Sequence, residues 1–148
     1  MGVEYLRLND LVNAGEAFRS ALRIKSEAFE PMINLGVTLF RLKDFAGAET
    51  VLREAVKLDE KSAPAHYFLG ETLAYLGKFD EAEKEFLSAV KLGGDEMKEA
   101  HRYLAIIYGL RKDKKRQAAE LETYLRLVPT APDAEQLRQL ADKLKSAP

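Results

Sequence analysis

The stretch Ala63–Leu92, APAHYFLGETLAYLGKFDEAEKEFLSAVKL, decides the fold of this chain. Apolar residues recur every three or four positions in each half, as Leu69, Leu73 and Leu76 and then as Phe79, Ala82, Phe86 and Ala89. This spacing places each set on one face of an α-helix. Gly77 separates the halves, where a tight turn needs a residue that tolerates positive φ. The stretch therefore predicts two amphipathic helices joined by a tight turn.

The same pattern recurs along the chain at intervals of 34 or 35 residues. A small residue fills one slot throughout, at Gly2, Gly36, Gly70 and Ala105. Other slots hold Tyr5, Leu39, Leu73 and Tyr108; Ala14, Ala48 and Ala82; Phe18, Leu52, Phe86 and Leu121; and Ala21, Ala55 and Ala89. Small residues let neighbouring helices approach closely, and the large residues fill the remaining space. Such regular recurrence predicts a repeat architecture.

These residues resemble the tetratricopeptide-repeat family, whose motif combines a Leu-Gly pair with spaced aromatic, Leu and Ala positions in a helix–turn–helix of about 34 residues. The resemblance covers residues 1–129, with copies at about 1–28, 29–62, 63–96 and 98–129. It implies an all-α, right-handed superhelical solenoid of antiparallel helix hairpins. The fourth copy is degenerate because Arg111, Lys114 and Gln117 occupy slots that are apolar in the others, so a looser turn is expected there.

The pattern predicts hairpin helices at Met1–Asn9, Asn13–Lys25, Phe29–Leu42, Phe45–Leu58, Ala63–Leu76, Phe79–Leu92, Met97–Leu110 and Lys115–Leu127. A ninth helix is expected at Pro132–Lys145, with Pro132 in its first turn and Thr130 and Asp133 forming a capping box. One face of this helix is apolar and the other polar, which is typical of a capping helix. Residues 130–148 are accordingly expected to form a capping helix and a tail.

The first copy is truncated, since Met1 already occupies the slot of Leu69. Either the chain is a fragment of a longer repeat protein, which we favour, or it begins with a short helix. In both cases the first hairpin lacks a cap, so we expect it to expose apolar surface and to offer a route to self-association.

The composition excludes several classes of function. A formal net charge of −1 predicts no bulk attraction to nucleic acid or to an anionic membrane, and the sequence RKDKKR at Arg111–Arg116 is interpreted as a solvated turn. The sequence contains no run of about 18 apolar residues, so no membrane-spanning segment is predicted. The absence of cysteine excludes disulfides and cysteine-based sites. No feature of the sequence indicates a compartment.

No catalytic, metal or cofactor site is predicted. His66 and His101 occupy the same slot in consecutive copies, but equivalent positions on neighbouring helices lie about 10 Å apart. That separation is too large for one ion, so both are expected to lie at helix interfaces. The serines have no histidine at a spacing suited to a nucleophile, and Gly93-Gly94 is too short for a phosphate loop.

The resemblance implies a concave groove lined by the exposed flank of each first helix. The candidate groove residues are Val37, Phe40, Arg41, Tyr67, Glu71, Tyr75, Arg102 and Ile106. Their apolar and aromatic character favours an amphipathic helix or an extended apolar peptide as ligand. Phe68 and Tyr103 have an alternative role, which is packing between adjacent first helices.

One subset of the family clamps the terminal carboxylate of chaperone tails with Lys, Asn and Arg. Only Asn34 matches here, because Pro64, Phe68, Glu99 and Tyr103 stand where cations are needed. We therefore do not expect that ligand. The leading hypothesis is a non-enzymatic protein–protein interaction scaffold, and the alternative is a structural segment that stacks through its first hairpin on further repeats or on a second copy.

Overall fold

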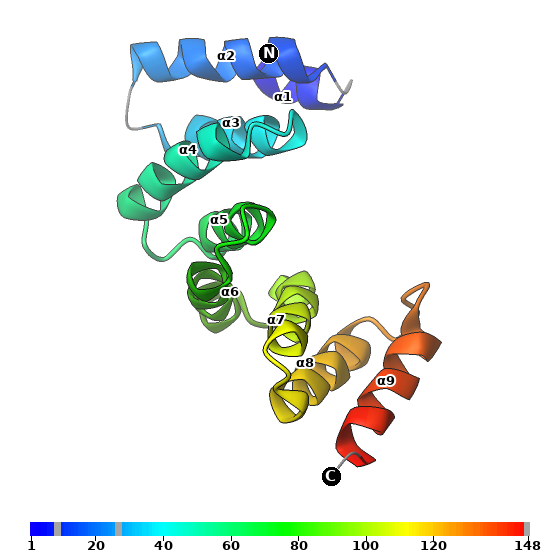
Figure 1. Cartoon of the computed structure of the whole chain (residues 1–148). Helices are drawn as coiled ribbons and strands as arrows, with labels where there is room; N and C mark the ends of the chain where they lie inside the picture. Colours follow the sequence, from blue (N-terminus) through cyan, green and yellow to red (C-terminus); the bar gives the residue numbers. More distant parts are fainter. Residues whose placement is uncertain (8–9, 26–27, 147–148) are drawn as a thin grey trace.

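The computed structural model describes residues 1–7, 10–25 and 28–146, and it contains helices but no strand within these ranges. The helices stack in chain order as an extended, curved array with the termini at opposite ends (Figure 1). They are α1 (Gly2–Arg7), α2 (Leu11–Ile24), α3 (Phe29–Arg41), α4 (Phe45–Leu58), α5 (Ala63–Tyr75), α6 (Phe79–Gly93), the 3-10 helix η1 (Gly94–Met97), α7 (Lys98–Leu110), α8 (Lys114–Leu127) and α9 (Ala134–Ser146). The chain is therefore an all-α helical-repeat solenoid.

The helices lie where the sequence pattern predicts them, with ends that differ by a few residues. The α2 helix begins at Leu11, two residues earlier than expected, because the Asp10 carboxylate accepts a hydrogen bond from the Asn13 backbone N–H at 3.3 Å. Ser62 caps α5 as expected, accepting from the Ala65 N–H at 3.2 Å. The expected end of the first helix at Asn9 lies outside the described residues.

The turn of the fourth hairpin is not looser than the others, so that expectation was wrong. The backbone N–H of the residue before each second helix donates to a carbonyl five residues back: Asp44 to Leu39, Lys78 to Leu73 and Asp113 to Tyr108, each at 2.9 Å. The residue before each of these donors has positive φ: 62° at Lys43, 75° at Gly77 and 58° at Lys112. Because backbone hydrogen bonds close this turn, polar side chains at neighbouring slots leave its geometry unchanged.

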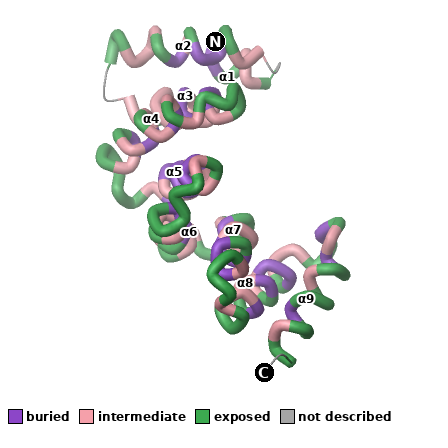
Figure 2. Tube along the Cα trace, in the orientation of Figure 1, coloured by how far each residue is buried: buried purple, intermediate pink, exposed green. Residues whose placement is uncertain are grey.

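The main hydrophobic cluster extends from α1 to α7, two smaller clusters join α8 and α9 to it, and the buried residues follow the lines along which helices meet (Figure 2). Its fully buried large side chains come from the repeated slots, and they include Leu52, Leu69, Leu73, Phe86 and Leu104. The small slot brings helices together: a Cβ added at Gly36 would lie 2.5 Å from Leu52 Cγ. Helix separation is therefore set by a glycine facing a buried side chain.

The capping helix α9 begins at Ala134, so the expected start at Pro132 was wrong. The Leu137 N–H donates to the Asp133 carbonyl at 3.0 Å, which makes Asp133 the N-terminal boundary residue and leaves Pro132 in the preceding turn. The helix packs on the last hairpin through a small cluster made by Ala105, Leu121, Leu137, Ala141 and Leu144. Within the described helices, none combines the length and apolarity needed to cross a membrane.

Two glycine-to-alanine substitutions should have opposite effects. Gly36→Ala should lower the free energy of unfolding by about 1–3 kcal/mol, because its Cβ would overlap buried Leu52. Gly15→Ala should raise it by up to about 1 kcal/mol, because that Cβ meets only Thr38 Cγ2 at 3.6 Å and alanine favours the helix. Urea unfolding followed by circular dichroism measures both changes in the free energy of unfolding. If the two changes had the same sign, the packing described here would be contradicted.

Candidate functional site

The first helices of successive hairpins touch one another, since α5 contacts both α3 and α7. The eight candidate groove residues all lie on these three helices: Val37, Phe40 and Arg41 on α3, Tyr67, Glu71 and Tyr75 on α5, and Arg102 and Ile106 on α7. Equivalent slots form rows across the helices. One row holds Val37, Glu71 and Ile106, and another holds Arg41, Tyr75 and Leu110.

An aromatic cluster joins α3, α4 and α5. The Tyr75 ring lies 5.0 Å from the Phe40 ring, edge to face, and 5.3 Å from the Phe45 ring, which it stacks. Tyr75 is nevertheless 60% exposed. The two phenylalanines therefore hold a large, solvent-facing ring in a fixed position. Phe45 was not among the predicted groove residues, since it belongs to a second helix and its repeat position is that of a packing residue.

A small hollow of about 220 Å³ lies between α3 and α5. Four of the candidate residues line it together with three others: Val37, Phe40, Arg41, Glu71, Leu52, Phe68 and Thr72. Its floor is buried, and the Thr72 hydroxyl donates to the Phe68 carbonyl at 2.8 Å. The structure therefore brings half of the candidate residues to one concave feature.

Tyr103 packs between α5 and α7, which is the alternative role considered for it. Its ring stacks on Phe86 with centroids 4.9 Å apart, and its hydroxyl donates to Glu71 Oε1 at 2.6 Å. The Tyr67 ring lies edge-on to both Phe68 and Tyr103. Phe68 differs from Tyr103 because it also lines the hollow between α3 and α5.

Glu71 is the half-buried carboxylate of this surface. Burial raises the pKa of Glu71, and the negative charge of nearby Glu99 raises it further. The hydrogen bond from Tyr103 lowers it by less, so the pKa lies above its ordinary value. Burial and the same two carboxylates also raise the pKa of the Tyr67 phenol. Among the described residues, Glu71 forms no ion pair with Lys, Arg or His.

Arg102 is engaged within the chain. Its guanidinium makes two hydrogen bonds to the Asp133 carboxylate, at 2.9 and 3.1 Å, and lies 5.1 Å from the centroid of the Tyr124 ring. This bidentate ion pair connects α7 to the turn before α9. Ile106, one turn further along α7, contrasts with it because its side chain is 55% exposed and projects apolar surface.

Two family models named tetratricopeptide repeat match this chain, at residues 1–64 and 39–107, and together they span residues 1–107. The chain belongs to the tetratricopeptide-repeat family. Among curated proteins, none matches the chain by sequence.

Solved structures share the tetratricopeptide-repeat fold at low sequence identity. A crystal structure of MamA is 21% identical, with a TM-score of 0.84, over 97% of this chain and 90% of MamA. YrrB, described as a tetratricopeptide-repeat protein with an unusual peptide-binding site, is 23% identical with a TM-score of 0.79, over 99% of this chain and 71% of YrrB. PilF of Pseudomonas aeruginosa is 21% identical with a TM-score of 0.85, over 97% of this chain and 66% of PilF.

The two histidines join the paired helices of their repeats, as expected. His66 Nδ1 lies 2.6 Å from Glu85 Oε2, and His101 Nδ1 lies 2.5 Å from Glu120 Oε2. Each glutamate lies 19 residues beyond its histidine, so the contact is itself repeated. No group of three or more potential metal ligands occurs among the residues that the structure describes.

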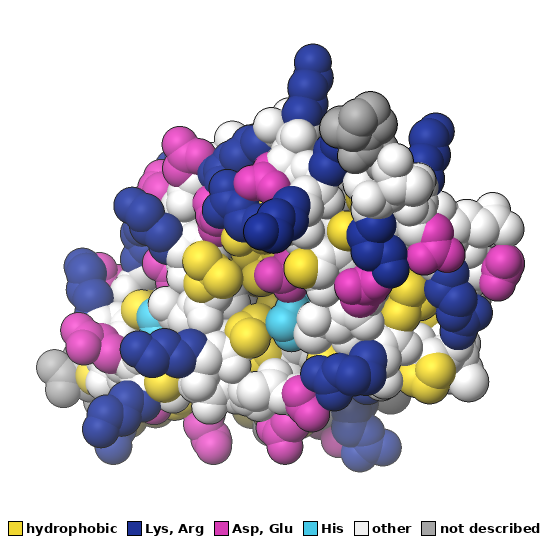
Figure 3. Space-filling view, turned by 90° about the horizontal axis from the view of Figure 1, so that it is seen from below, with side chains coloured by type: hydrophobic (Ala, Val, Ile, Leu, Met, Phe, Trp, Pro, Cys, Tyr) yellow, Lys and Arg dark blue, Asp and Glu magenta, His cyan; other side chains and the backbone are white. Residues whose placement is uncertain are grey.

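The Arg111–Arg116 stretch is solvent-exposed as expected, apart from half-buried Asp113, and its two arginines also connect consecutive repeats. Arg111 pairs with Asp80 and Glu83 of α6, and Arg116 pairs with Glu83 while lying 4.4 Å from the Tyr108 ring centroid. These cations are attracted to acidic residues on the preceding hairpin, which the spacing within one repeat does not reveal. Basic and acidic side chains also lie beside one another on the face in Figure 3.

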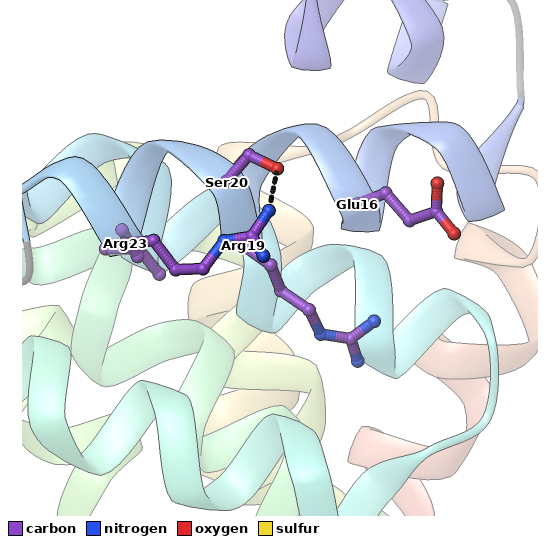
Figure 4. A pocket seen from close by; sticks show the side chains of 5 residues that line it. Glu16, Arg19, Ser20 and Arg23 are labelled. Carbon is purple, nitrogen blue, oxygen red and sulfur yellow. Dashed lines mark hydrogen bonds between the residues drawn. The ribbon is translucent and has the colours of Figure 1, made fainter.

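A more polar hollow of about 710 Å³ lies on α2 (Figure 4). Its lining residues all come from this one helix: Glu16, Arg19, Ser20, Leu22 and Arg23. The Arg23 guanidinium donates to the Ser20 hydroxyl at 2.9 Å, so part of the polar surface is already satisfied. With a lining from a single helix, this hollow lacks the convergent groups of a ligand site.

Glu71→Gln should stabilise the protein at neutral pH. The raised pKa means that the folded state favours the protonated carboxyl, so wild-type stability falls as the pH rises through that pKa. The glutamine still accepts the Tyr103 hydroxyl but carries no charge. We expect a gain below about 1 kcal/mol at pH 7, because the site is only half buried, and no gain at a pH below the ordinary glutamate pKa.

Urea unfolding at both pH values tests this expectation, with Glu30→Gln on exposed α3 surface as the control. A Glu71→Gln protein less stable than wild type at pH 7 would show that the charge supports the fold.

Proposed function

We propose that this protein is a non-enzymatic protein–protein interaction scaffold that binds a peptide or an amphipathic helix on the concave surface of its first helices. The observation that carries the proposal is the exposure of Tyr75 and Ile106. Other residues already fill the packing slots of α5 and α7, so these side chains are not needed for the core. Large exposed apolar groups in addition to a complete core are typical of a binding surface.

The arrangement around Tyr75 suits recognition at a low entropic cost. Phe40 and Phe45 contact its ring before any ligand arrives, so little side-chain freedom remains to be lost on binding. A ligand that covers Tyr75 and Ile106 would release water from both. Membership of the tetratricopeptide-repeat family and the peptide-binding site described for YrrB agree with this proposal.

A display selection of random linear peptides tests the groove. We expect peptides selected on the wild type to lose at least about tenfold in affinity on Tyr75→Lys/Ile106→Lys, since burying a lysine where an apolar ligand docks is costly. Leu87→Lys is the matched control, because Leu87 is 45% exposed on the second helix α6. Circular dichroism confirms that each variant is folded. Equal binding by all three proteins would place the site elsewhere.

A second candidate function is stacking through the first hairpin. Met1 is 91% exposed and Val3 57% exposed, and a hollow of about 480 Å³ between α1 and α2 is lined by Met1, Val3, Tyr5 and Ala17 among others. Apolar surface at this end of the array resembles the surface that a further hairpin covers in a solenoid. A second copy of the chain, or further repeats, would provide that cover.

Light scattering across a concentration series separates the two functions. Stacking predicts a mass that rises toward that of a dimer with concentration, and a return to one chain on Ala17→Lys, which places a charge in the hollow. Tyr75→Lys is the control and should leave the mass unchanged. A mass of one chain at every concentration would contradict self-association through this hairpin.

A further inference from the structure

A second apolar pocket lies beside the groove, between the beginning of α5 and the segment that leads into α7. Its volume is about 400 Å³, and four of its six lining residues are apolar or aromatic: Pro64, Tyr67, Phe68 and Met97. The remaining two are carboxylates, Glu96 and Glu99. We refer to it as the α5–α7 pocket. Its lining combines an apolar floor with acidic groups and contains no cation.

The charge around the α5–α7 pocket is not balanced within the chain. The side chains of Glu96 and Glu99 make no hydrogen bond or ion pair with any residue that the structure describes. Glu71 lies close enough for its charge to interact with that of Glu99, and it accepts only the neutral Tyr103 hydroxyl. Two carboxylates therefore line the α5–α7 pocket, and Glu71 of the adjoining hollow adds a third negative charge near Glu99, with no cation paired to any of the three among the described residues.

Comparably placed carboxylates on the second helices are paired. Glu49 of α4 is held by Arg53 and Lys78, and Glu83 of α6 is held by Arg111 and Arg116. Half-buried Glu49 and Glu83 on the second helices are thus neutralised by cations, whereas half-buried Glu71 on α5 has no cation partner among the described residues. Since an unpaired carboxylate beside apolar surface costs stability, the arrangement on α5 and α7 is complementary to a cation that is supplied from outside.

The chemistry of the lining narrows the kind of cation. A small hydrated ion would leave the floor of Tyr67, Phe68 and Met97 uncovered. The side chain of Lys or Arg instead carries its charge on an apolar stem, which can lie along such a floor while its head reaches the carboxylates. The Tyr67 ring offers a further favourable contact, since aromatic faces attract cations.

We propose that the α5–α7 pocket binds a Lys or Arg side chain of a partner peptide together with a neighbouring apolar side chain, the cation lying against Glu96 and Glu99, where Glu71 of the adjoining hollow adds negative charge. This inference rests on the proposed function and specifies its ligand as a basic–apolar segment. A basic ligand is the opposite of a peptide that is recognised by its terminal carboxylate. Recognition of that carboxylate needs cations at the positions where this chain has Pro64 and Glu99.

The test uses peptides from the display selection described above, synthesised with an acetylated N-terminus and measured by fluorescence polarisation. We expect the selected sequences to carry Lys or Arg next to an apolar residue. Replacing that residue by norleucine should weaken binding to the wild type about 10- to 100-fold, which is the usual cost of losing a charged hydrogen-bonded contact. The same replacement should have a clearly smaller effect on Glu71→Gln/Glu99→Gln, because only Glu96 of the three carboxylates then remains.

Glu30→Gln is the matched control, since Glu30 occupies the slot of Glu99 two repeats earlier but lines no part of this pocket. It should change affinity less than about twofold, because a distant surface charge is screened by salt. Glu99→Gln alone, a change at an exposed position, repeats the test without altering the half-buried Glu71. This variant should also bind the peptides that carry Lys or Arg more weakly than the wild type does.

The outcomes separate this inference from the proposed function. Peptides that depend on Tyr75 and Ile106 but bind equally well to Glu71→Gln/Glu99→Gln would overturn the cation site and leave the groove intact. Peptides that bind only with a free N-terminal amine would also overturn it, because the cation would then not be a side chain. Peptides that are unaffected by both sets of variants would overturn the groove as well.

Discussion

The close approach of a small residue to a large one is the contact on which this structure depends. Gly2 faces Phe18, Gly36 faces Leu52 and Gly70 faces Phe86, and Ala105 shares a cluster with Leu121. Each contact sets the separation of the two helices in one hairpin. Since the contact is repeated, the hairpins stack in a regular way and the first helices line up as one surface. The candidate groove is therefore a consequence of core packing.

Electrostatics divides the molecule into two kinds of surface. On the second helices, Glu49 pairs with Arg53 of its own helix and with Lys78 of the next hairpin, and Glu83 pairs with Arg111 and Arg116 of the next hairpin. On the first helices, the Glu71 carboxylate lies within electrostatic range of Glu99, and within the described part of the chain its one hydrogen-bond donor is the Tyr103 phenol. The second helices thus have their half-buried charges satisfied by the fold. The first helices retain charge and apolar area that a ligand can use.

The degenerate fourth repeat shows why side-chain pattern and backbone geometry are separate matters. Polar residues at Arg111 and Gln117 depart from the repeat pattern, yet the turn between α7 and α8 closes with the same hydrogen bond as its counterparts. Lys112 adopts the positive φ that Gly77 adopts one repeat earlier. Arg111 has a different role, because it pairs with acidic residues of α6. A departure from the pattern here marks a contact between repeats.

The sequence by itself determined the repeat, the helices and the hairpins, because core positions recur at a period that periodicity and small-residue slots reveal. It also placed Tyr75 and Ile106 on exposed flanks of first helices, and both side chains are exposed. Only the tertiary structure decided that Phe45 supports Tyr75, that Arg102 is held by Asp133 and that Glu71 has no cation partner among the described residues. Those features join residues from different helices, and the spacing within one repeat carries no information about which charges meet across the interface.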